Sequence, residues 1–272
     1  MPEGPEVATV VDELNEIMAG STIISIKTNL KSRYHNKETW NPPKTPFDIT
    51  KISCKGKNIF FHLSNAGQYK YMYNHLLMTG KWLLDKGNAS GIEFTFKQKD
   101  EIKKIYFDDI RKFGPILWMT KEQYDTKIKT IGPDLLTGEV TLDIWSQKIT
   151  NKRIKNKMIC DFLMDQKRVA GIGNYLKSEI LYRAKIRPDR KLCDLIKTEI
   201  EFLYKVALDT IQESYKKRGL TIRDYLTPKG KKGEFNILVY NKEGKLDENG
   251  YIIVREIFKD KRSTYWVKEI QK

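Results

Sequence analysis

Cysteine, histidine and long apolar runs are scarce in this sequence of 272 residues. The three cysteines, Cys54, Cys160 and Cys193, contain no Cys-x-x-Cys pair, and with the three histidines they form no group with zinc-ligand spacing. An odd number of cysteines is typical of reduced thiols in an intracellular compartment. No apolar run approaches the roughly 18–20 residues that a membrane span needs. The sequence therefore predicts no bound metal, no disulfide framework and no membrane partner.

Acidic residues are too few to balance the basic ones. There are 35 Asp and Glu against 50 Lys and Arg, which gives a net charge of +15. Solubility alone is the alternative explanation, but so large an excess favours a polyanionic partner, most simply nucleic acid. The acidic first residues lack the apolar segment of a signal peptide, so an intracellular location, in the nucleus or the cytoplasm depending on the host, is expected.

Hydrophobic periodicity changes along the chain. Apolar residues at helical spacing predict a first helix over 5–18. Short alternating runs separated by turn-like clusters then predict strands over 22–27, 58–63, 69–74, 91–96, 103–107 and 115–119. Helices are expected over 121–131, 152–164, 175–184 and 194–217, and the alternation within 235–267 predicts a hairpin.

These patterns predict an α+β fold with two main domains. Several short strands at this spacing are typical of a sandwich or barrel. The expected order is an N-terminal helix plus β-sandwich domain over 1–135, a linker over 136–151, a helical domain over 152–234 and a hairpin over 235–272.

The N-terminal residues Pro2, Glu3 and Glu6 have the chemistry of a nucleophilic site. Removal of Met1 would leave Pro2 with a free secondary amine, and an α-amino group has an ordinary pKa of roughly 7.7–8.0. The positive end of the following helix disfavours the protonated amine. Such an amine can attack an aldehyde-like carbon and form an iminium, with a neighbouring carboxyl as general acid or base. Ordinary helix capping is the alternative interpretation of the same residues.

Gly171-Ile172-Gly173-Asn174 precedes the helix expected over 175–184, with Asn174 as its expected cap. The positive end of a helix is a natural seat for a phosphate. The third glycine of a dinucleotide fingerprint is missing, so a plain turn between two helices remains the alternative.

Two segments between expected strands place apolar side chains near an arginine. Met78 lies in one, and Arg111 and Phe113 lie in the other. Such side chains can fill the gap that an extruded nucleotide leaves in a base stack. Burial of Met78 and Phe113 in a β-sheet core is the alternative.

Seven motifs in one order resemble the formamidopyrimidine-DNA glycosylase/endonuclease VIII (Fpg/Nei) family of base-excision repair enzymes. They extend over essentially the whole chain and are Pro2-Glu3-Gly4-Pro5-Glu6-Val7, Lys55-Gly56-Lys57, residues 75–80, residues 109–114, Ile131-Gly132-Pro133-Asp134, Met164-Asp165-Gln166 with Gly171-Ile172-Gly173-Asn174, and Arg262-Ser263-Thr264-Tyr265-Trp266.

The resemblance implies a role for each matching residue. Pro2 matches the Schiff-base nucleophile, Glu3 the general acid/base, and Glu6 a second acid that supports the site. Lys57 matches a lysine that approaches the phosphate on the lesion side and assists catalysis. The remaining matches are the void-filling residues Met78, Arg111 and Phe113, the phosphate ligand Asn174 of a helix-two-turn-helix motif, and the finger-tip phosphate ligand Arg262.

The hairpin departs from the zinc finger of most family members. Val267 and Ile270 stand where one cysteine pair is expected, and residues 246–249 contain no cysteine either. This pattern resembles the zincless finger of the endonuclease VIII-like branch, whose hairpin would be held by packing, here by Trp266, Val267 and Ile252. The short, Lys-rich stretch 226–238 differs from the loop that holds 8-oxoguanine.

The predicted function is that of a monomeric, cofactor-free, bifunctional DNA glycosylase and lyase. It would bind damaged DNA, duplex or single-stranded, and excise oxidised pyrimidines, formamidopyrimidines and hydantoins by β,δ-elimination. A non-catalytic protein that recognises distorted or damaged DNA is the main alternative. An RNA-binding module lacks its aromatic motif here, and a metal-dependent nuclease lacks a second carboxylate cluster beside Asp108 and Asp109.

Overall fold

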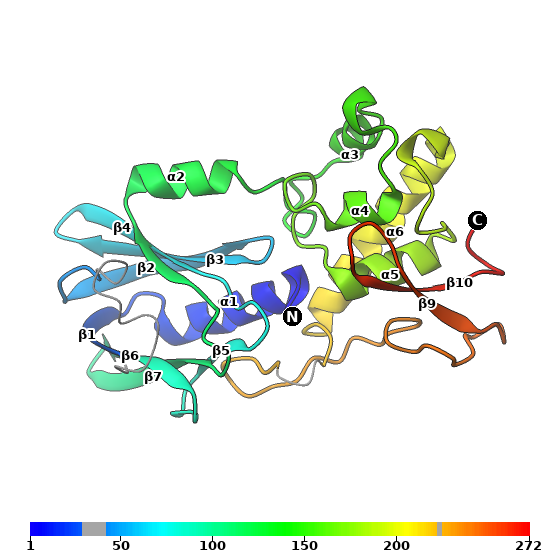
Figure 1. Cartoon of the computed structure of the whole chain (residues 1–272). Helices are drawn as coiled ribbons and strands as arrows, with labels where there is room; N and C mark the ends of the chain where they lie inside the picture. The colour runs from blue at the N-terminus through cyan, green and yellow to red at the C-terminus, as the bar shows by residue number, and fades with distance from the viewer. Residues whose placement is uncertain (29–41, 222–224) are drawn as a thin grey trace. The chain divides into compact units, whose positions relative to one another are not determined.

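The computed structural model describes residues 1–28, 42–221 and 225–272 and contains two compact units (Figure 1). The first, called the β unit, comprises Met1–Thr130 and Arg218–Glu234. The second, called the helical unit, comprises Ile131–Lys217 and Phe235–Lys272. Residues 218–234 were assigned to the helical domain from the sequence, but their described parts, 218–221 and 225–234, pack in the β unit because Leu220, Tyr225 and Lys229 bond to its first helix.

The described part of the β unit consists of helix α1 (Gly4–Met18), eight strands and helix α2 (Lys121–Lys129). The strands form one antiparallel sheet in the order β5-β7-β6-β1-β2-β3-β4-β8. Their bounds are β1 Thr22–Thr28, β2 Phe47–Lys55, β3 Asn58–Asn65, β4 Gln68–Asn74, β5 Gly80–Leu83, β6 Ser90–Gln98, β7 Glu101–Asp109 and β8 Ile116–Met119.

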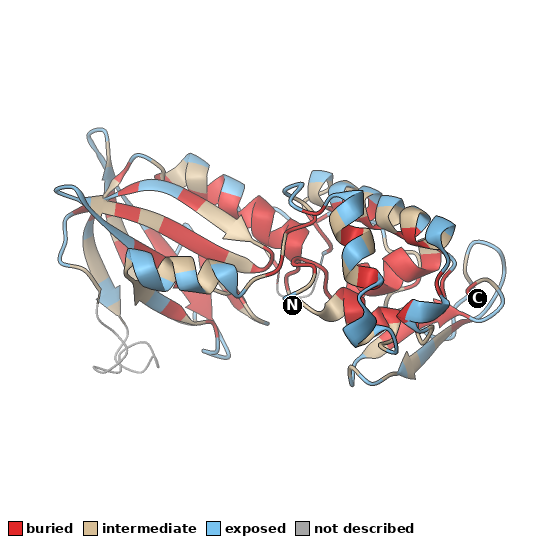
Figure 2. Cartoon of the chain, turned by 90° about the horizontal axis from the view of Figure 1, so that it is seen from above, coloured by how far each residue is buried: buried red, intermediate tan, exposed pale blue. Residues whose placement is uncertain are grey.

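Two parts of this sheet face each other across an apolar core. The indole of Trp82 on β5 lies 5.2 Å from the ring of Phe61 on β3 and 5.6 Å from Phe94 on β6. Helix α1 adds Val10 and Leu14 to the same core, and the Asn15 side chain bonds to the backbone of β2. In Figure 2 the buried residues run along the strands and along α1. The expected sandwich is confirmed.

The helical unit contains four α-helices and a hairpin. The helices are α3 (Leu142–Ile149), α4 (Ile159–Met164), α5 (Asn174–Arg183) and α6 (Lys197–Lys216), with 3-10 turns at Lys152–Ile154 and Leu192–Asp194. Strands β9 (Ile253–Ile257) and β10 (Ser263–Val267) form the hairpin. Eight of the ten residues of helix α5 are buried, and the helix packs against both α6 and β10.

Two strands escaped the sequence analysis. In β2 the residues Phe47, Ile49 and Ile52 are buried, but a bulge between Ile49 and Lys51 shifts the register and interrupts the alternation. Strand β5 has only four residues, too few to show a pattern. The other six strands and the first helix are confirmed within about two residues.

Two helical-unit expectations were wrong. The expected linker contains α3, which Thr141 caps by accepting from the Ile144 N–H at 3.3 Å, and which buries Trp145. The single helix expected over 152–164 is a 3-10 turn followed by α4, because Met158 between them is extended and bridges to Lys191. Within the described parts of the chain, no helix is both long and apolar enough to cross a membrane.

Candidate active site

The N-terminal turn of α1 brings Pro2, Glu3 and Glu6 together in a buried position. Glu3 is 3% exposed and Glu6 is fully buried. The Glu6 carboxylate accepts the Glu3 N–H at 2.8 Å, so it fixes the backbone directly after Pro2. Glu6 lies in the first turn of the helix, where a negative charge is favourable.

The segment 218–234 holds the other side of the Glu6 carboxylate. The Leu220 N–H donates to Glu6 Oε1 at 2.6 Å, and the Tyr225 hydroxyl donates to the Glu6 carbonyl at 3.3 Å. A Cβ on Gly219 would lie 2.3 Å from Glu6 Oε1, and the φ of this residue is +81°, so only glycine fits there. Further along, the Lys229 N–H donates to Glu13 at 2.8 Å. Leu220, Tyr225 and Lys229 thus bond along α1, and Leu220 secures the carboxylate beside Glu3.

Lys57 lies in the tight turn between β2 and β3. Gly56 has a φ of +57°, and Lys55 pairs with Asn58 across the turn. Lys57 is 5% exposed, and its charge reaches His75. Burial, together with Lys57 and Lys127, lowers the pKa of His75 to about 4. His75 is therefore neutral at pH 7, and its Nδ1 accepts the Leu77 N–H at 2.9 Å.

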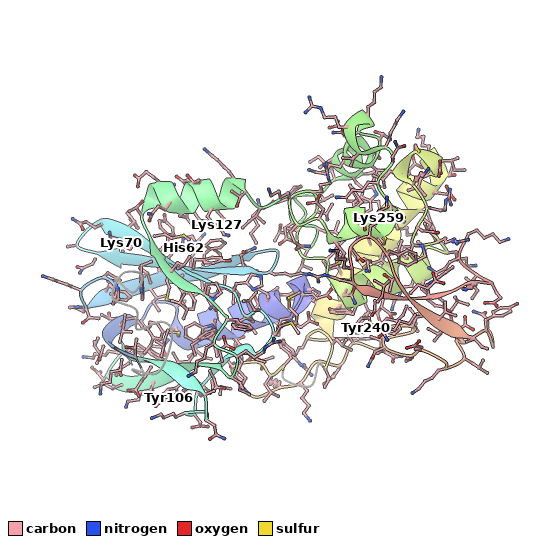
Figure 3. The ribbon with its side chains drawn as sticks, viewed as in Figure 1. His62, Lys70, Tyr106, Lys127, Tyr240 and Lys259 are labelled. Carbon is pink, nitrogen blue, oxygen red and sulfur yellow. The ribbon has the colours of Figure 1, made fainter. Side chains whose placement is uncertain are left out.

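Lys127 extends this basic region onto helix α2, where Figure 3 labels it. Its Nζ lies 4.7 Å from the ring centre of Tyr73 on β4, a cation–π contact. Burial raises the pKa of Tyr73 to about 12, so the phenol stays protonated. Neither His75 nor the Tyr73 phenol, the two side chains beside these lysines, therefore carries a charge near neutral pH.

Met78, Arg111 and Phe113 lie on two loops of the β unit. Met78 is 46% exposed and Phe113 is 49% exposed, so the alternative that both belong to the sheet core is wrong. The Arg111 guanidinium stacks 5.0 Å from the centre of the Phe113 ring. Large apolar tips next to a cation suit insertion into a base stack.

In the helical unit, three of the sequence motifs meet at the start of α5. Gln166 joins the motif 171–174 to residues 131–134. Its side chain donates to the Ile172 carbonyl at 2.7 Å and accepts the Gly171 N–H at 3.1 Å. Its carbonyl accepts from the Gly132 N–H at 2.9 Å. Gly173, not Asn174, caps the helix. The Asn174 Nδ2 group donates to the Ser263 carbonyl at 2.9 Å and so joins α5 to the hairpin.

A buried ion pair holds the hairpin tip near the same helix end. Lys177 on α5 is fully buried, and its Nζ lies 2.7 Å from Asp260 Oδ2. The other oxygen of Asp260 accepts the Arg262 N–H at 2.9 Å. Asn174 and Arg262, the two expected phosphate ligands, are thus joined within one unit through α5 and the hairpin.

The hairpin packs without cysteines. Val267 and Ile253 lie with Tyr182, Val239 and Tyr265 in a small apolar cluster, to which Ile270 adds. Trp266 is also buried, but Ile252 is 56% exposed, so its expected packing role was wrong. Among the residues that the structure describes, no group of three or more His, Cys, Asp or Glu has an arrangement that could hold a metal ion.

Two carboxylates that position neighbouring loops were missed as functional candidates. Glu179, fully buried on α5, accepts the N–H groups of Leu238, Val239 and Tyr240 at 2.8–3.0 Å. Asp109 joins the two loops that carry Met78 and Phe113. Asp109 lies in the sequence motif 109–114 but received no positioning role, and no local pattern in the sequence marks Glu179.

Comparison with known proteins identifies the family. Residues 1–116 match the formamidopyrimidine-DNA glycosylase N-terminal domain, and residues 131–225 match the formamidopyrimidine-DNA glycosylase H2TH domain. The formamidopyrimidine-DNA glycosylase of Zymomonas mobilis is 32% identical over 100% of both chains. That of Lactiplantibacillus plantarum is 30% identical over 98% of this chain and 97% of the relative.

Solved structures agree with this result. The Lactococcus lactis Fpg in complex with DNA containing an abasic site is 27% identical, with a TM-score of 0.86 over 99% of both chains. The MutM (Fpg) protein of Thermus thermophilus, at 24% identity, shares the fold, with a TM-score of 0.85 over 99% of this chain and 98% of that one. The chain therefore belongs to the formamidopyrimidine-DNA glycosylase family.

Proposed function

We propose that this protein is a bifunctional DNA glycosylase and abasic-site lyase that excises oxidised bases through an iminium on Pro2. The observation that carries the proposal is the buried N-terminal turn, in which Glu6 fixes the backbone of Glu3 next to Pro2. Family membership supports it, because the relatives at 30–32% identity are named as DNA glycosylases.

The chemistry needs a neutral amine at the N-terminus. Once Met1 is removed, the Pro2 nitrogen can attack C1′ of the damaged nucleotide as the base leaves with its bonding electrons, and the amine proton passes to the departing base. Glu3 gives a proton to the sugar-ring oxygen, and ring opening leaves a positively charged iminium between Pro2 and C1′. The positive end of α1 next to the amine favours its neutral, nucleophilic form.

Strand cleavage follows because the positively charged iminium withdraws electrons and makes the C2′ proton acidic. Loss of a C2′ proton expels the 3′ phosphate, which is the β-elimination. A second proton loss expels the 5′ phosphate, which is the δ-elimination, and water then releases the sugar fragment from Pro2. Lys57, buried close to His75, supplies the positive charge that stabilises a phosphate near the reacting sugar.

DNA binding is supported by the overall charge and by the relatives' structures. The net charge of +15 favours phosphate contacts, so affinity should fall steeply with salt. The Lactococcus lactis Fpg has been solved with DNA containing an abasic site and with DNA containing an oxidised pyrimidine. We infer that this protein accepts oxidised pyrimidines, formamidopyrimidines and hydantoins, in duplex or single-stranded DNA, and acts as a monomer.

We also assign the protein to the endonuclease VIII-like branch with a zincless finger. The support is the hairpin itself, in which Val267 and Ile270 pack in an apolar cluster where a zinc-binding relative would have cysteines. Expression in medium depleted of zinc should therefore leave its unfolding temperature and its activity unchanged.

A protein that retains Met1 tests the proposal. Two preparations, one shown by mass spectrometry to begin at Pro2 and the other at Met1, are mixed in EDTA with duplex DNA that contains thymine glycol. We expect base release and strand cleavage only from the preparation that begins at Pro2. Equal cleavage by both preparations would contradict the proposal, and DNA binding without cleavage by either would favour the non-catalytic alternative.

A further inference from the structure

Two loops of the β unit leave the sheet at the same place. Residues 75–79 lead from β4 into β5, and residues 110–114 lead from β7 into β8. Their bases are adjacent because Gly80 pairs with Asp109 in the β5–β7 ladder. Met78 is on the first loop, and Arg111 and Phe113 are on the second.

One carboxylate bonds to both loops. Asp109 is 2% exposed, and its Oδ1 accepts the Thr79 hydroxyl at 2.5 Å while its Oδ2 accepts the Gly114 N–H at 2.7 Å. The Thr79 oxygen in turn accepts the Arg111 N–H at 3.2 Å. Hydrogen bonds to an ionised carboxylate are shorter and stronger than those between neutral groups. The Thr79 hydroxyl on the first loop therefore bonds both to Asp109 and to the backbone of the second loop.

The backbone around this connection is tightly constrained. Leu77 and Lys112, one in each loop, have φ values of +51° and +55°, which a residue with a side chain rarely adopts. A Cβ on Gly80 would lie 2.6 Å from the Leu76 carbonyl, and a Cβ on Gly114 would lie 2.9 Å from the His75 carbonyl. Strained conformations persist only where the surroundings fix them, and they concentrate at functional sites.

We propose that Thr79 and Asp109 form a latch that holds Met78, Arg111 and Phe113 as one rigid wedge, which makes Thr79 a positioning residue for nucleotide flipping. The inference rests on the proposed function. Side chains that enter a base stack must resist restacking, and a wedge whose two halves move independently would lose the extruded nucleotide. The latch joins the halves at their bases and leaves their tips exposed.

The latch makes different predictions for two substrates. Release of a base requires that the nucleotide be unstacked and held out of the duplex, at a cost of free energy that is lowest for a damaged or unpaired nucleotide. A preformed abasic site has no base to unstack. A loosened wedge should therefore slow base release more than it slows cleavage of abasic DNA, whereas a loss of folded protein would lower both rates equally.

The test compares Thr79→Val with Thr79→Ser. Valine keeps the shape of threonine but removes the hydroxyl, and serine keeps the hydroxyl. Single-turnover rates are measured on one duplex that contains thymine glycol and on the same duplex with an abasic site. For Thr79→Val we expect base release to fall about tenfold, as for the loss of one or two hydrogen bonds, and abasic cleavage to change by less than about twofold. Thr79→Ser should show the wild-type ratio of the rate of base release to the rate of abasic cleavage.

Two further variants make the result secure. Asp109→Asn replaces one of the two acceptor oxygens of the carboxylate by an amide nitrogen. It should also lower the ratio of base release to abasic cleavage. Thr50→Val is the matched control, because the exposed Thr50 on β2 also donates its hydroxyl, in its case to the His62 carbonyl at 3.1 Å, and its loss should leave the ratio of base release to abasic cleavage unchanged.

The outcomes separate the latch from the function on which it rests. An active wild type, with parallel losses or no change in Thr79→Val, would overturn the latch alone. A wild type that neither releases a base nor cleaves abasic DNA would overturn the proposed function and the latch with it.

Discussion

In the β unit, buried carboxylates bond to the backbone beside the candidate catalytic and void-filling residues, whereas in the helical unit the buried carboxylate of Glu179 holds residues 238–240 and a buried ion pair holds the candidate phosphate ligands. Glu6 accepts from Glu3 and Leu220, and Asp109 accepts from Gly114 and Thr79. In the helical unit, Lys177 and Asp260 bring the hairpin tip to α5. A carboxylate that accepts backbone N–H groups fixes the position of individual residues in a loop or turn. The ion pair instead joins a helix to a hairpin.

This difference leads us to separate chemistry from binding. Changes at the carboxylates of the β unit should alter reaction rates more than DNA affinity. Changes in the helical unit should alter stability or DNA affinity more than the rate of bound complexes. The predictions below follow this division, from the largest expected effect to the smallest.

Replacement of Glu3 by Gln should have the largest effect. The amide keeps the size of the side chain but cannot give up or take a proton, and loss of a general acid or base costs roughly 10²–10⁴-fold in rate. We expect single-turnover base release to fall by that factor, with the dissociation constant for the same duplex changed less than about threefold. A rate within tenfold of the wild type would show that another group moves the proton.

Replacement of Lys177 by Met should destabilise the helical unit. It would leave Asp260 buried without its charged partner, which typically costs about 3–5 kcal/mol in the free energy of unfolding. Urea unfolding measures this cost. Lys268→Met is the matched control, because Lys268 is 57% exposed in its pair with Glu256 and such surface pairs contribute about 0–1 kcal/mol. Equal losses in both variants would contradict the structural role of the buried pair.

Replacement of Arg262 by Ala should weaken DNA binding without altering the chemistry. If Arg262 contacts one phosphate, the slope of log K against log salt should decrease by about 1. The single-turnover rate at saturating protein should stay within about threefold of the wild type. An unchanged slope would remove Arg262 from the phosphate contacts.

The last prediction concerns the pH dependence of stability. Burial and the charge of Lys51 lower the pKa of His62 to about 4, compared with about 6.5 in an unfolded chain. As the pH falls, His62 is protonated in the unfolded chain before it is protonated in the folded protein. The free energy of unfolding is therefore unaffected by His62 above pH 6.5 and decreases as the pH falls toward 4. Urea midpoints of the wild type should fall more between about pH 7 and pH 4.5 than those of His62→Gln. Parallel curves would contradict the lowered pKa.

Much of the β unit could be predicted from the sequence because its strands alternate cleanly. Helix α1 and six strands follow from periodicity, and the exceptions are physical: a bulge breaks the pattern of β2, and β5 is too short to show one. In the helical unit the capping residue Thr141 was overlooked, so α3 was taken as linker. Residues 218–234 join the β unit through bonds to Glu6 and Glu13, far away in the sequence, which no local pattern shows.

The candidate site shows the same limit. The motifs that contain Pro2, Glu3 and Glu6 were visible in the sequence, and so were Asn174 and Arg262. The groups that hold Glu6 and the hairpin tip in place were not recognised, because Leu220 and Lys177 act through contacts that only the fold creates. Sequence patterns indicate which side chains can react, and tertiary contacts determine which are held in position.

Borohydride trapping followed by peptide mapping tests the central claim most directly. The protein that begins at Pro2 is mixed in EDTA with DNA that contains an abasic site, and borohydride reduces any iminium to a stable bond. The account predicts a covalent protein–DNA product whose modified peptide carries the sugar on the nitrogen of Pro2, and no such product from a preparation that retains Met1. A sugar attached to Lys57 or another lysine, with Pro2 unmodified, would contradict the proline mechanism.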